Sequence, residues 1–168
     1  MSRIKNLIDE IARTADCTIL PPSGIPRISP KDTLTPELQE FYEICGGVSL
    51  FGSSIYSIEI VPPKEFVQAN NEILIGATQE DLNALHDDIS SSWYIIGRGN
   101  NRQYVTIDLG INRSGKCYDS FWDRYAMPGY MPVIANSFFN LLNNLHASRG
   151  EHWYWLQPSF ASLGDAYD

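Results

Sequence analysis

The chain has 168 residues, of which 43% are hydrophobic and 19% charged, a composition that is typical of a folded domain and excludes disorder. This length predicts one domain with a core large enough to need no disulfide or metal. Twelve basic residues against 20 acidic ones give a net charge of −8. A negative field of this size argues against nucleic acid and anionic membranes as partners and favours basic ones.

The negative charge is concentrated in one stretch of the chain. Residues 32–97 hold eleven acidic residues and a single base, Lys64, a net of −10, whereas the other 102 residues carry +2. One interpretation is an acidic binding face; the alternative is a set of solvated helix faces. The acidic residues of this stretch are Asp32, Glu37, Glu40, Glu43, Glu59, Glu65, Glu72, Glu80, Asp81, Asp87 and Asp88.

Targeting and redox features of the sequence predict a cytoplasmic protein. The first residues lead into Asp9 and Glu10 without an apolar stretch, so no secretory signal is expected, and runs such as residues 73–77 are too short to span a membrane. Three cysteines at wide spacing, Cys17, Cys45 and Cys117, fit buried thiols better than a disulfide framework or a zinc site.

Helical patterns dominate the first half of the chain. Apolar residues of 3–15 fall on one stripe, which predicts an amphipathic helix, and a proline-rich extended segment, 21–36, follows. A second helix is expected from the cap Thr35 to the glycine pair after residue 45. Further helical segments are expected after Pro62-Pro63 and from Thr78 to Leu85.

The second half changes to the alternation of strands. Strands are expected at 55–60, 93–96, 104–108 and 116–120, and the last three form an antiparallel meander. A final amphipathic helix is expected from about Val133 to Ala147. The fold class is therefore α+β, with a central antiparallel or mixed sheet flanked by helices. We expect residues 1–33 to pack on a core of residues 34–147, and residues 148–168 to form an aromatic tail.

No catalytic motif emerges, and we predict neither an enzyme nor a cofactor or metal site. The sequence has no nucleophile elbow, P-loop, dinucleotide fingerprint or zincin helix. His86-Asp87-Asp88 is the nearest approach to a metal or acid–base cluster, but neighbouring residues on a helix diverge, so a solvated helix end is the preferred interpretation. In the tail, Trp153 and Trp155 are expected to clamp the chain onto the domain; a partner contact is the alternative.

Six segments in order resemble the SUKH superfamily, the Smi/Knr-type domains. The first is the helix-to-glycine motif from Leu34-Thr35-Pro36 to Gly46-Gly47, and the resemblance extends over residues 34–146. The chain departs from the usual pattern at turns, including Cys45-Gly46 and the hairpin 99–103, which lacks the usual acidic residue. The other segments are residues 60–66, 93–97, 103–108, 115–118 and 134–142.

The resemblance implies a single α+β domain with a non-catalytic binding role. This superfamily groups bacterial immunity proteins of polymorphic toxin systems with fungal regulators of cell-wall assembly. An immunity protein, or antitoxin, of this kind occupies a toxin domain, frequently a nuclease. A basic nuclease surface would suit the acidic charge of this chain.

The sequence therefore predicts a cytoplasmic immunity-type protein that binds and neutralises a basic toxin. Alternatives are a scaffold or regulator of cell-wall assembly and, third, a hydrolase or metalloenzyme around His86. Trp122, Tyr125 and Tyr130 are expected to supply buried anchors to the protein partner. The acidic residues expected to steer and orient it are Glu37, Glu40, Glu43, Glu80, Asp81, Asp87 and Asp88.

Overall fold

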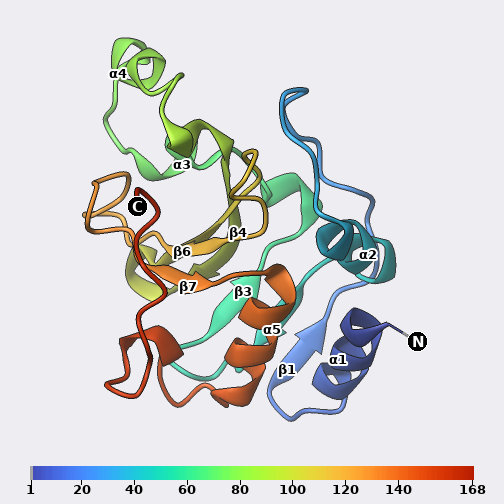
Figure 1. Cartoon of the computed structure of the whole chain (residues 1–168). Helices are drawn as coiled ribbons and strands as arrows, with labels where there is room; N and C mark the ends of the chain where they lie inside the picture. The colour runs from blue at the N-terminus through green and yellow to red at the C-terminus, as the bar shows by residue number, and fades with distance from the viewer. Residues whose placement is uncertain (1) are drawn as a thin grey trace.

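The computed structural model describes residues 2–168, and Figure 1 shows helices on one side of a long sheet and a separate helical tip. The helices are α1 (Arg3–Ala12), α2 (Pro36–Ile44), α3 (Ala69–Ile73), α4 (Gln79–Ala84) and α5 (Phe138–Ala147). The strands are β1 (Cys17–Ile19), β2 (Val48–Leu50), β3 (Ile58–Ile60), β4 (Trp93–Gly99), β5 (Tyr104–Asp108), β6 (Cys117–Asp119) and β7 (Val133–Ala135).

The seven described strands form one sheet in chain order, and every neighbouring pair is antiparallel. The longest pairing joins β4 to β5, with Trp93 opposite Asp108 and a register shift between Ile95 and Gly97. The predicted α+β class is confirmed, and the sheet is antiparallel throughout the described residues. The meander is also longer than predicted, because β1, β2 and β7 were too short to show an alternating pattern.

Helices α1, α2 and α5 pack against one another beside the sheet. Each has a hydroxyl N-cap, and these caps are Ser2, Thr35 and Ser137. The α2 residue Phe41 meets Phe138 of α5 edge-on, with ring centroids 4.9 Å apart, and both rings are buried. This three-helix layer covers the sheet and closes the core.

Several predicted boundaries were wrong. The last helix begins at Phe138 rather than near Val133, because residues 133–135 pair with β6 as the edge strand β7. The predicted strand 55–60 is reduced to residues 58–60, since residues 54–56 form a turn and Ile55 is exposed. The first helix ends at Ala12 instead of residue 15. The proline-rich segment runs without helix or strand over residues 21–35, as predicted, and its last proline, Pro36, begins α2.

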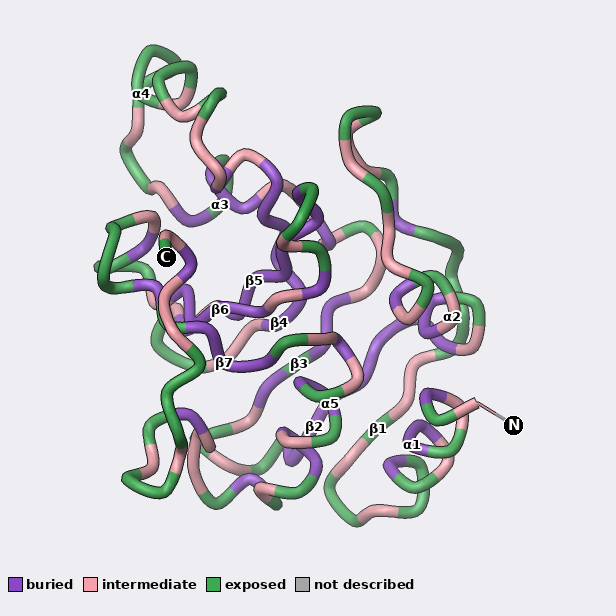
Figure 2. The backbone as a smooth tube through the Cα atoms, viewed as in Figure 1, coloured by how far each residue is buried: buried purple, intermediate pink, exposed green. Residues whose placement is uncertain are grey.

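The segment from α3 to α4 forms the tip at the top left of Figure 1. Figure 2 shows α4 almost entirely exposed, and none of its residues is buried. No helix within residues 2–168 is long and apolar enough to cross a membrane. Because Ala69 and Ile73 of α3 belong to the core, only the α4 part of the tip is a projection that the core does not need for its own packing.

Candidate partner-binding surface

Local hydrogen bonds hold α4 together in the absence of core contacts. Thr78 accepts a hydrogen bond from the Asp81 amide at 3.1 Å, and the Asp81 carboxylate accepts one from the Thr78 amide at 2.9 Å. This reciprocal capping box satisfies two free amides of the first turn. The backbone hydrogen bond from Thr78, followed by the Thr78 side chain, lowers the pKa of Asp81. Asp81 therefore stays ionised while it caps the helix.

Three further side chains of the tip face solvent. Glu80 lies in the first turn of α4, and the side chain of Asp87 beyond its end is fully exposed, with only His86 Nδ1 near it at 3.4 Å. Ile75, in the turn before α4, is 70% exposed. An exposed isoleucine beside free carboxylates suits contact with a partner that is both apolar and basic.

A hollow of about 640 Å³ separates this tip from the loop that follows β6. Its apolar wall comes from the α3–α4 connection, and Asp81 and Asp123 add carboxylates. The hollow is lined by residues 73–77 together with Asp81, Leu85, Arg102, Trp122, Asp123 and Tyr125. An apolar concavity with a few charged groups is typical of a site that receives a partner side chain. We call this hollow, together with Ile75, Glu80 and Asp87, the α4 surface.

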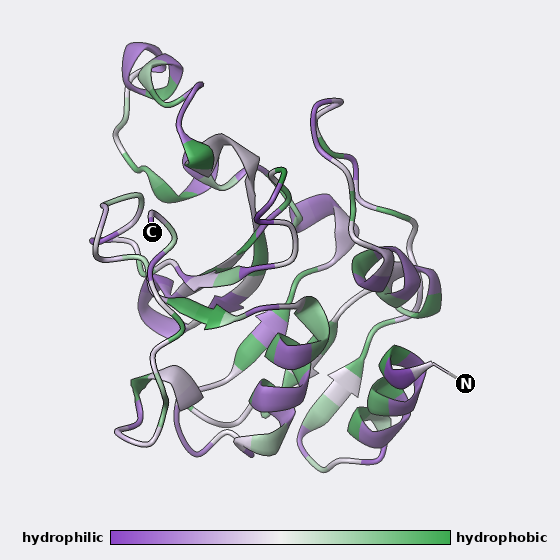
Figure 3. Cartoon of the chain, viewed as in Figure 1, coloured by the Kyte–Doolittle hydropathy of each residue, from purple (hydrophilic) through white to green (hydrophobic). Residues whose placement is uncertain are grey.

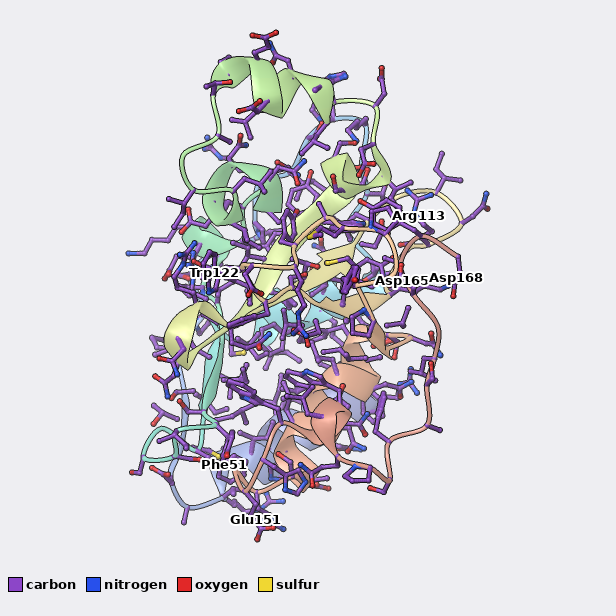
Figure 4. All side chains as sticks on the ribbon, turned by 90° about the vertical axis from the view of Figure 1, so that its left-hand side faces the viewer. Phe51, Arg113, Trp122, Glu151, Asp165 and Asp168 are labelled. Carbon is purple, nitrogen blue, oxygen red and sulfur yellow. The ribbon has the colours of Figure 1, made fainter. Side chains whose placement is uncertain are left out.

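Trp122 and Arg102 form one side of the hollow. The guanidinium carbon of Arg102 lies 4.3 Å from the centroid of the Trp122 ring, and Trp122 remains 43% exposed. Arg102 has a left-handed backbone, with φ of +60°, and its buried Nε and Nη2 atoms have no hydrogen-bond partner among the described residues. Figure 4 shows Trp122 on the flank below the tip. The cation–π contact with Arg102 fixes the orientation of the indole, which stays partly exposed to solvent.

The end of the chain ties the two sides of the α4 surface together. Tyr167 donates a hydrogen bond to the Asp88 carboxylate at 2.9 Å, beside α4. Asp165 accepts hydrogen bonds from the amides of Gly129 and Met131 at 3.1 and 2.7 Å, within the loop of residues 121–131 that follows β6. The last four residues therefore position both the tip and the loop.

The profile of the SMI1 / KNR4 family (SUKH-1) matches residues 33–144, two thirds of the chain. The chain belongs to this family. The resemblance seen in the six sequence segments is thus confirmed, and these segments include the helix-to-glycine motif that became α2. In this SUKH-1 chain the α4 surface lies within the matched region.

A curated relative covers almost the whole SUKH-1 chain. The immunity protein YokJ of Bacillus subtilis (strain 168) is 46% identical over 165 residues, which are 98% of this chain and 96% of the relative. No solved structure matches the chain significantly. The relation extends through the N-terminal helix and the aromatic tail, beyond the region matched by the family profile.

The acidic residues of α2 lie apart from the α4 surface (Figure 1). Glu37 accepts a hydrogen bond from the Phe139 amide at 2.7 Å and pairs with Arg3 at 3.1 Å, so it links α1, α2 and α5. Glu40 accepts a hydrogen bond from Ser2, and Glu43 accepts one from Gln39 at 2.8 Å. The structure therefore separates these residues from the α4 surface; Glu37 and Glu40 bind other elements of the fold, whereas Glu43 is exposed and bonded only within α2.

Other acidic residues of the stretch 32–97 also have internal partners. Asp32 is held by Ser92 and Tyr94 at 2.8 and 2.7 Å. Glu65 and Glu72 both reach Arg98, at 3.4 and 3.1 Å. A count of charges along the chain therefore overstates the free negative charge, because Arg98 lies just outside the stretch in sequence but beside it in space.

Two predicted contact residues support the surface from within. Tyr125 is only 4% exposed and donates to the Asn70 side chain at 2.6 Å, so it forms the base of the hollow. Asp88 caps the following turn by accepting from the Ser90 amide at 2.9 Å. Tyr130, in contrast, is 56% exposed and available for contact.

Sequence reasoning did not identify Arg102, Ile75 or the tail residues as parts of this surface. Asn101, just before Arg102, has a φ of +57°, a left-handed conformation that asparagine tolerates. The Asn100-Asn101 pair therefore indicated a turn at this point, which places Arg102. The role of the tail had no comparable signal, because residues 165–168 meet the loop across more than 30 positions of sequence.

The His86-Asp87-Asp88 sequence forms no converging site. The His86 side chain is 82% exposed and points into solvent beside Asp87, while Asp88 turns back to Tyr167. Within residues 2–168 no three histidine, cysteine, aspartate or glutamate side chains gather closely enough to hold a metal ion. The arrangement suits a solvated helix end.

Proposed function

We propose that this protein is an immunity protein that binds a toxin through the α4 surface and neutralises it without catalysis. The 46% identity to an immunity protein over nearly the whole chain carries this proposal and favours it over a regulator of cell-wall assembly. The buried thiols of Cys45 and Cys117 are free, which agrees with action in the reducing cytoplasm.

The toxin in this proposal presents a basic surface with at least one apolar anchor. Glu80 and Asp87 are free of cationic lysine and arginine partners within the described residues, so their field is open to an approaching protein. Rim charges of this kind raise the association rate and orient the complex. Trp122 and Ile75 provide apolar area where the partner docks. A nuclease fits this description, since its phosphate-binding surface is basic.

The test uses the product of the gene adjacent to the one that encodes this chain, as the candidate toxin. Co-expression is expected to restore growth of a cell that produces the toxin, and the purified proteins are expected to form a complex. The association rate should fall when salt rises from 50 to 300 mM, because screening shortens the reach of the charges. A complex that forms at the same rate at both salt concentrations would contradict the electrostatic steering and leave immunity intact.

A charge reversal locates the surface. Glu80→Lys should lower the association rate about threefold or more, since it inverts a rim charge of the α4 surface. Glu151→Lys is the matched control, because Figure 4 places Glu151 at the opposite end of the molecule and the net charge changes equally. Equal rates for both variants would place the toxin elsewhere. Failure of the wild-type protein to bind or protect would refute the immunity function itself.

A further inference from the structure

The hollow of the α4 surface contains two carboxylates that the fold leaves without a cation. Asp81 belongs to α4 and Asp123 to the loop after β6, so the two acids come from opposite walls. Among the described residues, neither forms an ion pair with a lysine or arginine. Asp81 uses its Oδ2 to cap α4, and Asp123 is exposed. Both side chains therefore have carboxylate oxygens free to bind a ligand.

The charge around the hollow favours a cationic ligand. Residues 72–88 contain five acidic residues and no lysine or arginine. The lining has a single cation, Arg102, whose guanidinium carbon lies 4.3 Å from the centroid of the Trp122 ring and which pairs with no carboxylate among the described residues. Because two carboxylates accompany this one guanidinium, the lining is negative, and a second cation would neutralise it.

The remaining walls favour a cation with a long hydrocarbon stem. Ile75 and Leu85 supply apolar surface, and Figure 3 shows the hydrophobic end of α3 close to the largely hydrophilic α4. Lysine and arginine bury their methylene groups on apolar surface while the charged head stays with polar groups. A purely apolar side chain would instead cover two carboxylates without neutralising them, which costs free energy. The hollow therefore suits an amphipathic, cationic side chain.

The aromatic wall distinguishes arginine from lysine. Trp122 is 43% exposed, and Arg102 already demonstrates that this ring stacks with a guanidinium. A guanidinium also has five N–H donors in one plane and can bond to two carboxylates at once, whereas an ammonium is a compact point charge. Two carboxylates beside an open indole therefore match arginine better than lysine.

We propose that the hollow of the α4 surface binds one arginine side chain of the toxin. Its guanidinium lies between Asp81 and Asp123, and its stem packs on Ile75 and Leu85. The identity of the partner rests on the proposed immunity function, but the chemistry of the hollow does not. Asp81 and Asp123 are thus the residues that orient the toxin, and Glu80 and Asp87 act on its approach.

A double-mutant cycle with the candidate toxin tests this assignment. Each arginine and lysine of the toxin is replaced by methionine, and the dissociation constants are measured with the wild-type chain and with the double variant Asp81→Asn, Asp123→Asn. Replacement of one arginine is expected to weaken binding to the wild type about tenfold and binding to the double variant less than about twofold. Asparagine at position 81 keeps an oxygen that can accept from the Thr78 amide, so α4 should stay capped.

The matched control is the double variant Glu43→Gln, Glu151→Gln. It removes the same charge from two exposed residues outside the hollow, and the toxin arginine should keep its full effect with this variant. A toxin that binds the Asp81, Asp123 variant as tightly as the wild type, or that has no arginine coupled to these aspartates, would overturn the proposal and leave immunity intact. Coupling to a lysine would show that the choice of arginine is wrong.

A small probe tests the hollow without the toxin. N-acetyl-arginine amide, titrated at millimolar concentration into the ¹⁵N-labelled full chain, is expected to shift the indole Nε1–H signal of Trp122 in a saturable manner. The Asp81, Asp123 variant should lose this shift, and N-acetyl-norleucine amide, which has a stem without a guanidinium, should not produce it. An equal shift with both compounds, or none with either, would refute the arginine site. Failure of the toxin to bind the wild type would refute immunity, and the probe would still decide the chemistry of the hollow.

Discussion

Trp93 and Asp108 lie opposite each other on β4 and β5, and the indole Nε1 donates a hydrogen bond of 3.0 Å to the carboxylate Oδ2. Both residues are completely buried. The same carboxylate accepts from the Tyr118 hydroxyl at 2.6 Å, the Arg113 Nε at 3.1 Å and the Gly110 amide at 2.8 Å. Four donors converge on one buried acid, which fixes three strands and the β5–β6 turn in one register.

Replacement of this acid should destabilise the fold severely. Asp108→Asn removes the charge that faces Arg113 and leaves buried donors without full acceptors, so we expect a loss of about 3 kcal/mol in the free energy of unfolding. Urea denaturation measures this change. Asp123→Asn, at an exposed position, should change it by less than about 0.5 kcal/mol. Equal stability of the two variants would show that the buried network contributes little.

Trp122 is expected to be the main apolar anchor for the toxin. Trp122→Ala removes the exposed indole ring that Arg102 stacks on, and we expect toxin affinity to fall about 30-fold, equivalent to about 2 kcal/mol. Calorimetric titration gives the dissociation constant. Leu156→Ala, which removes another exposed apolar side chain at 56% exposure, should leave affinity unchanged. A Trp122 variant that binds as tightly as the wild type would exclude the Trp122 indole from the interface.

Glu37 should behave as a structural residue despite its place in the acidic stretch. Glu37→Ala removes both the hydrogen bond to the Phe139 amide and the pair with Arg3, and the expected loss is about 1–2 kcal/mol of unfolding free energy. Toxin affinity is expected to stay within twofold of the wild-type value. Thermal unfolding and calorimetry separate the two effects, and a large loss of affinity without a loss of stability would return α2 to the binding surface.

The hydroxyl of Tyr167 should control the order of the tip. Tyr167→Phe deletes the hydrogen bond to Asp88 and is expected to cost about 1 kcal/mol of local stability. Hydrogen exchange should then accelerate in residues 86–92 but not in the central strands. Tyr104→Phe on β5 is the control, because the Tyr104 hydroxyl makes no hydrogen bond to residues 86–92 within the described part of the chain. Unchanged exchange at residues 86–92 would argue that the tail does not position α4.

His146 predicts a pH dependence of stability. Burial, reinforced by Arg149, lowers the pKa of His146 below its usual value. The Thr14 hydroxyl lies 2.8 Å from Nε2. The unfolded imidazole binds a proton at about pH 6.5, whereas the folded one binds it only at lower pH, so unfolding takes up a proton between these two pKa values. The free energy of unfolding should therefore fall as pH drops below about 6.5.

A variant isolates this contribution. In His146→Gln the slope of unfolding temperature against pH should flatten between pH 6.5 and 5, relative to wild type. An unchanged slope in the His146 variant would assign the acid sensitivity to other groups.

The helices were predictable where a capping residue stands before a run of apolar residues with helical spacing. Thr35 caps α2 and Thr78 caps α4 as the sequence indicated, because hydroxyl caps act within three residues of the chain. The strand β7 was missed because Val133 and Ile134 also fit an apolar helical stripe, and the cap that starts α5, Ser137, follows them. Local patterns cannot distinguish the two when a three-residue strand leads directly into a helix.

The site was predictable only in part. The acidic residues of α4 and the aromatic Trp122 were identified from residue type, and the structure places Asp81 and Trp122 around one hollow. The sequence did not predict that Glu37 and Glu40 lie apart from these residues. A count of charges along the chain does not show which carboxylates accept hydrogen bonds from within the fold. The tail likewise contacts the loop by long-range pairing; the predicted clamp is confirmed for Trp155, whose Nε1 donates to Asp119 at 3.1 Å.

The lack of any buried residue in α4 also bears on how this protein changes over evolutionary time. Substitutions at exposed positions outside structural motifs usually leave stability almost unaffected. Apart from its capping pair, α4 can therefore exchange residues freely while the sheet and three-helix layer remain intact. Under the proposed function, a lineage whose toxin diverges is expected to follow it by altering α4, without compensating changes in the core.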